Sequence, residues 1–482
     1  MTIHHGQLDL RRGVPPHSQY GNAGRYGRMF PTLPPFAPDT SDVRALLLEL
    51  GKAGGPMDPS NECDNPDNPE IPAGYTFLGQ FLDHDVTFDP TSSLERQVDP
   101  ESISNYRTPA FELDSLYGAG PVASPHLYDQ RRPGRLLLDE GCVWDVPRNS
   151  QRTALVGDPR NDENLIVSQL HLAFAKFHNA VLGSVAPHGH EDAFETARRL
   201  VRWHYQWLIV HDYLPRTVGW DFVRQALRRR RFYGWRHEPF IPIEFSAAAF
   251  RFGHSQVRPG YVANDGFSAP IFDPTLDPDS PDPEDLRGGK RAPRRYTQWR
   301  HFFEIDRPPT PSKRIDTTLS SPLFTLPFLP ENVPHAPRSL AQRNLLRQVA
   351  FGLPSGQSVA RIMRVEPLSP HDLSDLPKAF AHSTPLWFYV LREAQVQCDG
   401  KRLGPVGGRI LAEVFVGLLQ GDSMSYLHQD PRWVPPFAVD RAFGMTDLLR
   451  FADLVQGSQD RSDASSRRIS SPTRPPPDGA AG

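Results

Sequence analysis

The chain has 482 residues, of which 38% are hydrophobic and 23% charged, and its formal net charge is −3. This composition excludes a wholly disordered protein and a collagen, and the near-neutral charge gives no sign of a nucleic-acid partner. No apolar run reaches the ~18 residues of a membrane span. The three cysteines lack the spacing of a disulfide framework or a zinc site. Because the first residues, MTIHHGQLDLRRG, lack the apolar core of a secretory signal, we expect a protein that is cytoplasmic or exported without a conventional signal.

Helical patterns dominate the chain, and 51 prolines interrupt it. Residues 1–40 predict an extended arm on the core, residues 262–335 a long irregular stretch, and residues 456–482 a disordered tail. We therefore expect a mainly α fold with few strands: one large helical domain over 41–455, with its catalytic core at about 70–420. The predicted helices cover 41–54, with Ser41 as N-cap, 162–183, 191–214, stopped by Pro215, 244–256, 338–351, 385–397 and 405–419.

Polar groups interrupt the near-helical apolar spacing of residues 74–89, GYTFLGQFLDHDVTFD. Such groups on an apolar face cost free energy unless they are paired, so this segment is a candidate site of chemistry. A second candidate is His254 in FRFGH, which follows three alanines that would allow close approach of a flat group. A lone histidine of this kind is more often a core residue than a ligand. Arg251, about one turn before it, needs an anionic partner, and haem propionates would serve.

Two further segments concentrate charge. GDPRNDE, residues 157–163, places Arg160 and Glu163 at the start of a helix, where they also fit a surface ion pair and a first-turn acid. The loop RTPAFELDSLYG, residues 107–118, offers oxygen atoms at alternate positions. With Asp85 added, this set suits Ca²⁺, although a solvated acidic loop has the same composition.

Four histidines form pairs at i,i+7 spacing on the two long helices. Members of a pair lie roughly 10 Å apart along the helix axis, which is too far for one zinc ion, so we expect core or surface residues. They are His171 with His178 and His204 with His211.

Taken together, the motifs resemble the haem peroxidase superfamily typified by animal peroxidases such as myeloperoxidase and peroxinectin, including its bacterial members. The resemblance covers about residues 70–420. Each motif is modest by itself, but six in the family's order are hard to obtain by chance. In chain order they are GQFLDHD, RTPAFELDSLYG, GDPRNDE with a following helix that ends in FHN, FRFGH, RNLLRQVAFGLPSG and LGPVGGRILAEVFVGLL.

The resemblance implies a role for each matching residue. The distal residues that act on peroxide would be His84, Arg160 and Gln80. The haem contacts would be His254 as iron ligand, Asn344 as its hydrogen-bond acceptor, Arg251 on a propionate, and Asp83 and Glu163, which match carboxylates esterified to haem methyls in vertebrate enzymes. The calcium shell would be Asp85, Thr108, the Ala110 carbonyl, Glu112 and Asp114.

The sequence also departs from the family pattern. Asn164 stands where myeloperoxidase has a methionine that links to haem through sulfur, so that bond is not expected here. Glu112 replaces a usual aspartate, which should loosen the calcium shell. RQVAFG lacks the usual Arg-Asp-His triplet, and the framework disulfides are absent.

The implied function is a peroxidase that carries haem b, or an ester-linked derivative, together with Ca²⁺. It would reduce hydrogen peroxide through an oxoferryl intermediate and oxidise a halide or an organic small-molecule donor. One alternative is a haem-dependent fatty-acid dioxygenase, but such relatives place a tyrosine three residues before the proximal histidine, where this chain has Arg251. Another is a non-enzymatic adhesion or scaffold member of the fold, against which the presence of His84, Arg160 and His254 weighs. The sequence predicts no oligomeric state.

Overall fold

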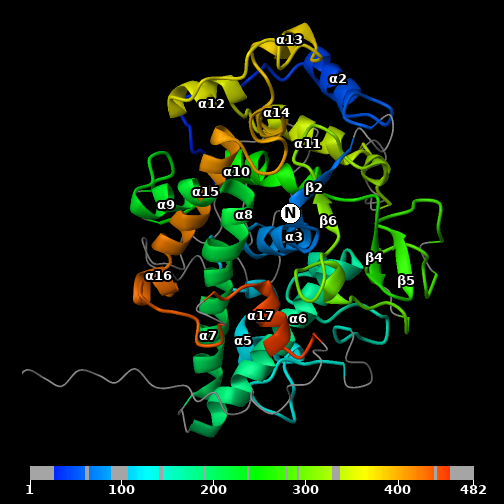
Figure 1. Ribbon diagram of the computed structural model, residues 1–482, viewed down its shortest axis with the longest axis vertical. Coiled ribbons are helices and arrows are strands. Elements are labelled where there is room, and N and C mark those ends of the chain that lie inside the picture. Colours follow the sequence, from blue (N-terminus) through cyan, green and yellow to red (C-terminus); the bar gives the residue numbers. More distant parts are fainter. Residues whose placement is uncertain are drawn as a thin grey trace, which may run out of the picture.

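Helices make up most of the regular structure of the chain, as the sequence predicts (Figure 1). The computed structural model describes residues 26–59, 65–87, 107–139, 145–188, 192–235, 238–277, 280–289, 292–327, 337–438 and 442–455. The tail predicted over 456–482 and the first 25 residues of the arm lie outside these ranges. The longer helices are α2 (Ser41–Leu50), α3 (Gly74–Val86), α6 (Leu165–Val185), α7 (Ala193–Leu208), α9 (Trp220–Arg228), α11 (Leu340–Ala350), α12 (Gly356–Met363), α14 (Leu386–Cys398), α15 (Pro405–Gly421) and α17 (Met445–Phe451).

Short elements connect these helices. The short helices are α4 (Asp114–Tyr117), α5 (Gly120–Ala123), α8 (Leu214–Val218), α10 (Ile243–Ser246), α13 (Lys378–Ala381) and α16 (Tyr426–Gln429). Turns of 3₁₀-helix are η3 (Pro125–Leu127), η4 (Pro159–Asp162), η5 (Ala186–His188), η7 (Ala249–His254), η8 (Trp299–His301) and η9 (Ser321–Phe324). Among the described residues, the strands form three two-stranded sheets. These are β1 (Tyr26–Gly27) with β3 (Ile241–Pro242) in parallel, β2 (Asp67–Pro72) with β6 (Pro311–Lys313) antiparallel, and β4 (Gly260–Asn264) with β5 (Phe267–Pro270) antiparallel.

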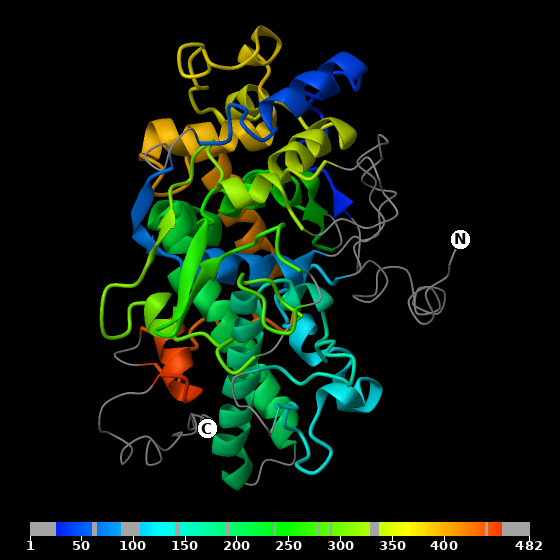
Figure 2. The same cartoon turned by 90° about the vertical axis from the view of Figure 1, so that its right-hand side faces the viewer.

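Helix α3 lies near the middle of the molecule, with α6 and α7 on one side of it and α2 packed against α11 at the far end (Figures 1 and 2). Its apolar face meets the two long helices through an aromatic cluster. Phe81 stacks on Phe174 with ring centroids 4.9 Å apart, and Tyr205 meets Phe174 edge-on at 5.6 Å. Burial of each such ring contributes about 1.5–3 kcal/mol, so this contact fixes the position of α3.

The helix predicted to stop at Pro215 continues past it, so that prediction was wrong. A π-helical turn, Ile209–Tyr213, follows α7 and leads directly into α8, whose first turn contains Pro215. Proline has no N–H and is tolerated in the first turn of a helix, and the wider π turn provides a new helix start there. The turn also directs Tyr213 toward the cavity described below.

The continuous helix predicted over 244–256 is also wrong. The chain leaves α-helical geometry at Ala248 and re-forms as the 3₁₀ turn η7. Two side chains donate hydrogen bonds to backbone carbonyls that would accept from backbone N–H groups in a continuous helix. Arg251 Nε donates to the Ser246 carbonyl at 2.8 Å, and Gln348 Nε2 donates to the Ala247 carbonyl at 2.9 Å. Because residues three apart eclipse in a 3₁₀ turn, Arg251 and His254 share one face.

Residues ahead of α2 pack on the core. The Glu244 carboxylate accepts hydrogen bonds from the backbone N–H groups of Met29 and Phe30, at 2.9 and 3.1 Å. Arg28 donates to the carbonyls of Phe351 and Gly352, just after α11. Helix α2 is capped by Thr40 and not by Ser41, because the Thr40 hydroxyl accepts from the N–H of Val43.

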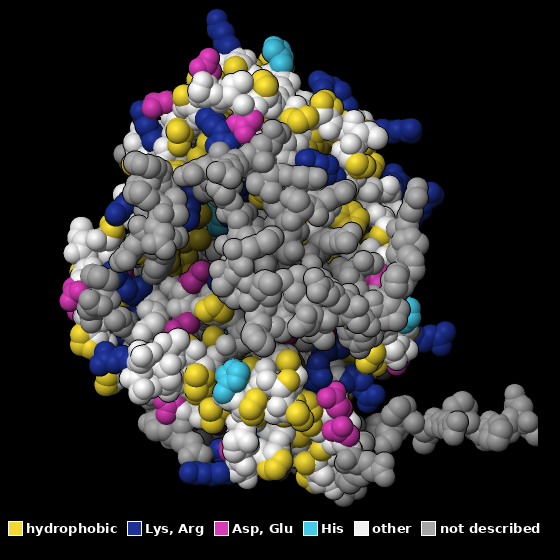
Figure 3. Space-filling view, turned by 180° about the vertical axis from the view of Figure 1, so that it is seen from behind, with side chains coloured by type: hydrophobic (Ala, Val, Ile, Leu, Met, Phe, Trp, Pro, Cys, Tyr) yellow, Lys and Arg dark blue, Asp and Glu magenta, His cyan; other side chains and the backbone are white. Residues whose placement is uncertain are grey.

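The described surface has mixed charge. On the face shown in Figure 3, lysine and arginine side chains are interspersed with aspartate and glutamate, in keeping with the net charge of −3. Within the described part of the chain, no helix is both long and apolar enough to cross a membrane.

Candidate active site

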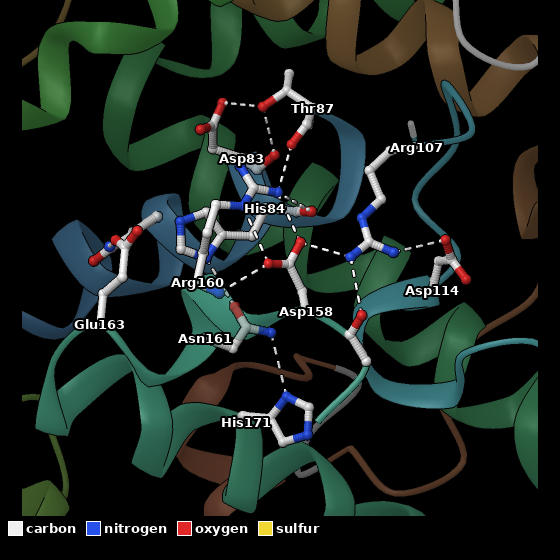
Figure 4. A network of polar contacts seen from close by, with 12 residues as sticks. Asp83, His84, Thr87, Arg107, Asp114, Asp158, Arg160, Asn161, Glu163 and His171 are labelled. Carbon is white, nitrogen blue, oxygen red and sulfur yellow. Dashed lines mark hydrogen bonds and ion pairs between the residues drawn. The ribbon is translucent and has the colours of Figure 1, made fainter. Parts of the chain in front are cut away.

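The distal wall of the site is built from the C-terminal half of α3 and the turn η4. His84, only 4% exposed, points from α3 toward this turn (Figure 4). Arg160 holds the two elements together: its Nη2 donates to the carbonyls of His84 and Thr87, at 3.0 and 2.6 Å, and to the Asp158 carboxylate at 2.8 Å. These bonds place the Arg160 guanidinium beside His84, with the Asp158 carboxylate as its counter-charge.

His84 is a neutral base in this environment. Burial first, and then the positive charge of Arg160, disfavour the imidazolium and lower the pKa of His84 to about 4. The ring is therefore uncharged near neutral pH and able to accept a proton.

Asn161 was not among the residues singled out from the sequence, yet it contacts His84 directly. Its Oδ1 lies 2.8 Å from His84 Nδ1, and its Nδ2 lies 3.2 Å from His171 Nδ1 (Figure 4). Asp158, which the sequence also did not point out, forms ion pairs with both Arg160 and Arg107. The run of polar residues in GDPRNDE was the available signal, but polar residues at a helix start are usually caps.

Two carboxylates predicted to contact haem lie on the same wall. Asp83 pairs with Arg251 at 3.1 Å; burial alone would raise the pKa of Asp83, but the charges of Arg251 and Arg160 outweigh it and the pKa is lowered. Burial raises the pKa of Glu163 to about 7. The Gln80 amide is held at both ends, since Nε2 donates to Glu163 and Oε1 accepts from Asn164, at 3.2 and 3.1 Å.

The proximal wall is formed by η7 and α11. The Asn344 side-chain amide lies 2.7 Å from Nδ1 of His254, its Nδ2 being the nearer atom. With the amide turned to present Oδ1, it accepts the Nδ1 proton of His254 and leaves Nε2 as a bare lone pair. No hydrogen bond joins Nε2 to another described residue. A hydrogen bond of this kind orients an imidazole that binds a metal.

A single cavity of about 830 Å³ separates the two walls. Its volume is in the range of cofactor sites, and about half of its lining residues are apolar while the other half are polar or charged. Arg343 and Arg347 of α11 line it together with Arg251, so three guanidinium groups besides that of Arg160 border the cavity. The predicted residues that line it are Gln80, Asp83, His84, Arg160, Glu163, Arg251, His254 and Asn344. These residues fit a porphyrin held between two imidazoles.

The predicted calcium residues are only partly assembled. Asp85 Oδ2 accepts from Leu113 N–H and from the Tyr205 hydroxyl, whereas buried Oδ1 has no hydrogen-bond partner in the described part of the chain. Burial, and then Asp114 and Glu112, raise the pKa of Asp85 to about 7. Arginines hold the other two carboxylates: Arg107 pairs with Asp114 at 2.9 Å, and Arg202 with Glu112 at 3.6 Å. No three acidic, histidine or cysteine side chains of the described residues are grouped as a metal site.

Comparison with known proteins finds similarity to animal haem peroxidases. The family model for animal haem peroxidase matches residues 96–274. Thyroid peroxidase of Homo sapiens is 29% identical over 189 residues, which is 38% of this chain and 19% of that protein. Peroxidase mlt-7 of Caenorhabditis elegans is 31% identical over 179 residues, 34% of this chain and 24% of that protein.

The match to the animal haem peroxidase family covers residues 96–274, which is less than half of the chain. The fold agrees over most of the length: peroxidase A from Dictyostelium discoideum superposes with a TM-score of 0.63 at 17% identity, covering 89% of this chain and 90% of that one. The fatty acid alpha-dioxygenase of Arabidopsis thaliana superposes with a TM-score of 0.59 at 14% identity, covering 92% and 81%. The chain spans less than a quarter of the two curated relatives above, and 8% of the dual oxidase of Drosophila melanogaster, which it matches at 34% identity over 120 residues.

Proposed function

We propose that this chain is an animal haem peroxidase domain that binds haem between His84 and His254, reduces hydrogen peroxide, and oxidises a halide or an organic small-molecule donor. One observation carries the proposal. A single cavity is lined from opposite walls by two imidazoles, each with its Nδ1 on an asparagine side chain, and by the guanidinium of Arg160. Haem, when bound, supplies the iron at which the oxygen–oxygen bond of peroxide breaks.

The residues of the chain supply the proton transfers and the charge. Neutral His84 takes the proton from one peroxide oxygen and returns it to the other, which leaves as water. Arg160 stabilises the negative charge that develops on the departing oxygen. On the other wall, Asn344 fixes the ring of His254 and raises its basicity as a ligand.

An absorption spectrum of the purified protein tests this proposal. We expect a Soret band that changes when hydrogen peroxide is added, and turnover of guaiacol under the same conditions. A protein with no haem band, or with a band that peroxide leaves unchanged, contradicts the proposal.

The dioxygenase alternative has less support. Arg251 stands where the dioxygenase relatives were expected to carry a radical tyrosine, and its guanidinium is committed to Asp83 and to the Ser246 carbonyl. Oxygen uptake with a polyunsaturated fatty acid, and none with guaiacol and peroxide, would support the dioxygenase instead.

We further propose that Asp83 and Glu163 form one or two ester bonds to haem methyl groups during peroxide turnover. In each bond, a methyl C–H is replaced by a C–O bond to the carboxyl group. Hydrogen peroxide accepts the two electrons and becomes two waters, with one hydrogen from the methyl group and one proton from the carboxyl group or from solvent. Both carboxylates line the cavity. After peroxide treatment, acid-acetone should leave haem on the wild-type protein and release all of it from the Asp83→Asn, Glu163→Gln double variant. Complete release from the wild type contradicts the proposal.

Calcium is the other proposed component, held by Asp85, Thr108, the Ala110 carbonyl, Glu112 and Asp114. The buried, unpartnered Asp85 Oδ1 supports it, because a nearby cation would satisfy that oxygen. Adding Ca²⁺ to EGTA-treated holoprotein at ~100 times its Kd should stabilise the fold by about 2.7 kcal/mol. The rise in Tm should be absent in Asp85→Asn and with Mg²⁺. A wild-type Tm that is the same in EGTA and in Ca²⁺ contradicts calcium binding.

A further inference from the structure

The Asn161 side chain lies between two imidazoles. It is fully buried, and it sits on the turn η4, which also carries Arg160. Its Oδ1 is 2.8 Å from Nδ1 of His84 on α3, and its Nδ2 is 3.2 Å from Nδ1 of His171 on α6 (Figure 4). One amide therefore links the distal histidine to a second buried histidine outside the cavity.

This arrangement has a chemical consequence for His84. A neutral imidazole carries one proton, so a ring that donates from Nδ1 has a bare lone pair at Nε2. The Asn161 oxygen can only accept, and it therefore selects this form of His84. If the amide rotated by a half-turn, its N–H would face His84 and select the opposite form, which cannot accept a proton at Nε2. With its own proton on Nε2, His171 accepts from Asn161 Nδ2 at Nδ1 and opposes that rotation.

The turn that carries Asn161 is clamped from several sides. Arg148 forms two short bonds to the Asp162 carboxylate, at 2.6 and 2.8 Å, and Gly289 N–H donates to the same group. Gly288 passes so close that an added Cβ would lie 1.6 Å from the Asp162 carbonyl oxygen. Only glycine fits at that position, and the turn has little room to shift.

We propose that Asn161 is the positioning residue that selects the Nδ1–H form of His84, and that His171 holds the Asn161 amide in the orientation this requires. The inference rests on the proposed function, because the Nδ1–H form of His84 matters for the reaction with hydrogen peroxide only if the protein is a peroxidase. It can be tested separately with hydrogen cyanide, whose binding to ferric haem also requires a base to take its proton. Carbon monoxide binds ferrous haem without any proton transfer and reports only on access to the cavity.

Stopped-flow measurements on haem-loaded variants test the proposal. In Asn161→Ala, association of hydrogen cyanide and reaction with hydrogen peroxide should both slow by about 10- to 100-fold, the usual cost of removing a residue that orients an imidazole. Carbon monoxide association should stay within about twofold. His171→Phe keeps the ring but removes the acceptor, and should slow the same two reactions to a smaller extent. The matched control is Asn179→Ala, which removes a different buried amide, one on α6 that is bonded at both ends to the Leu136 backbone, and should leave all three rates unchanged.

The outcomes separate the possible failures. Unchanged cyanide association in Asn161→Ala overturns the inference, and so does an equal slowing of carbon monoxide, which would indicate a deformed cavity. If the wild type binds cyanide through haem but does not react with peroxide, the proposed function fails, whereas the cyanide series still decides the role of Asn161. A wild type without a haem band overturns both.

Discussion

Replacing His84 by leucine is expected to slow the reaction with hydrogen peroxide by about 10²- to 10⁴-fold, the usual contribution of a general base. Leucine fills the space of the ring but cannot move a proton. The His254–Asn344 pair and the four cavity arginines are untouched, so the variant should still bind haem. Stopped-flow absorbance of the Soret band gives the rate, and the resting spectrum gives the haem content.

His204→Phe is the matched control, because it also removes a fully buried histidine but one that does not line the cavity. Its rate with peroxide should equal that of the wild type. If His84→Leu reacted with peroxide as fast as this control, His84 would not be the base.

His204 should also make the fold less stable in acid. Burial lowers the pKa of His204 to about 3, against about 6.5 in an unfolded chain. Its Nδ1 donates to the Leu200 carbonyl at 2.7 Å, its Nε2 has no partner among the described residues, and the rings of Trp433, Phe437 and Phe443 surround it. Below pH 6.5 the unfolded state therefore binds a proton that the folded state does not. The stabilisation is complete above pH 6.5 and is lost as pH falls toward 3, at ~1.4 kcal/mol per pH unit.

Phenylalanine at position 204 keeps the ring packing and removes the titration. The free energy of unfolding of His204→Phe, minus that of the wild type, should rise by about 2 kcal/mol between pH 7.5 and pH 5. Urea unfolding at several pH values measures it. The difference between variant and wild type is measured because buried acids change the stability with pH in the opposite direction. Burial raises the pKa of Glu393 to about 8, for example, and this contribution cancels in the difference. A difference that does not change with pH contradicts the prediction.

The sequence predicted the long helices well, because α6, α14 and α15 bury residues at helical spacing and end close to the expected positions. It also predicted that residues as distant as Gln80 and Asn344 share one site, and the structure places them in one cavity. The roles assigned to these residues stay predictions.

Other features depend on contacts between segments far apart in the chain and could not be read locally. The π turn before Pro215 and the break at Ala248 depend on donors and packing from elsewhere in the fold. Asn161 looks like one more polar residue at a helix start until α3 and α6 bring two imidazoles to it. In the sequence Arg107 looks like an ordinary loop residue. In the fold it forms an ion pair with Asp158, which also pairs with Arg160.

The hydrogen bonds of residues 28–30 have a consequence for where a working domain begins. This segment forms hydrogen bonds with Glu244, which lies just before the turn that carries His254. It also forms hydrogen bonds with residues just after α11, the helix that carries Asn344. It therefore links the two segments of backbone that carry His254 and Asn344. The relative position of these segments sets the angle between the His254 imidazole and the Asn344 amide. A chain that begins at residue 41 would keep every residue of the cavity but would lose the hydrogen bonds of residues 28–30. The anchoring of a bound iron would then weaken through parts of the protein that never touch it.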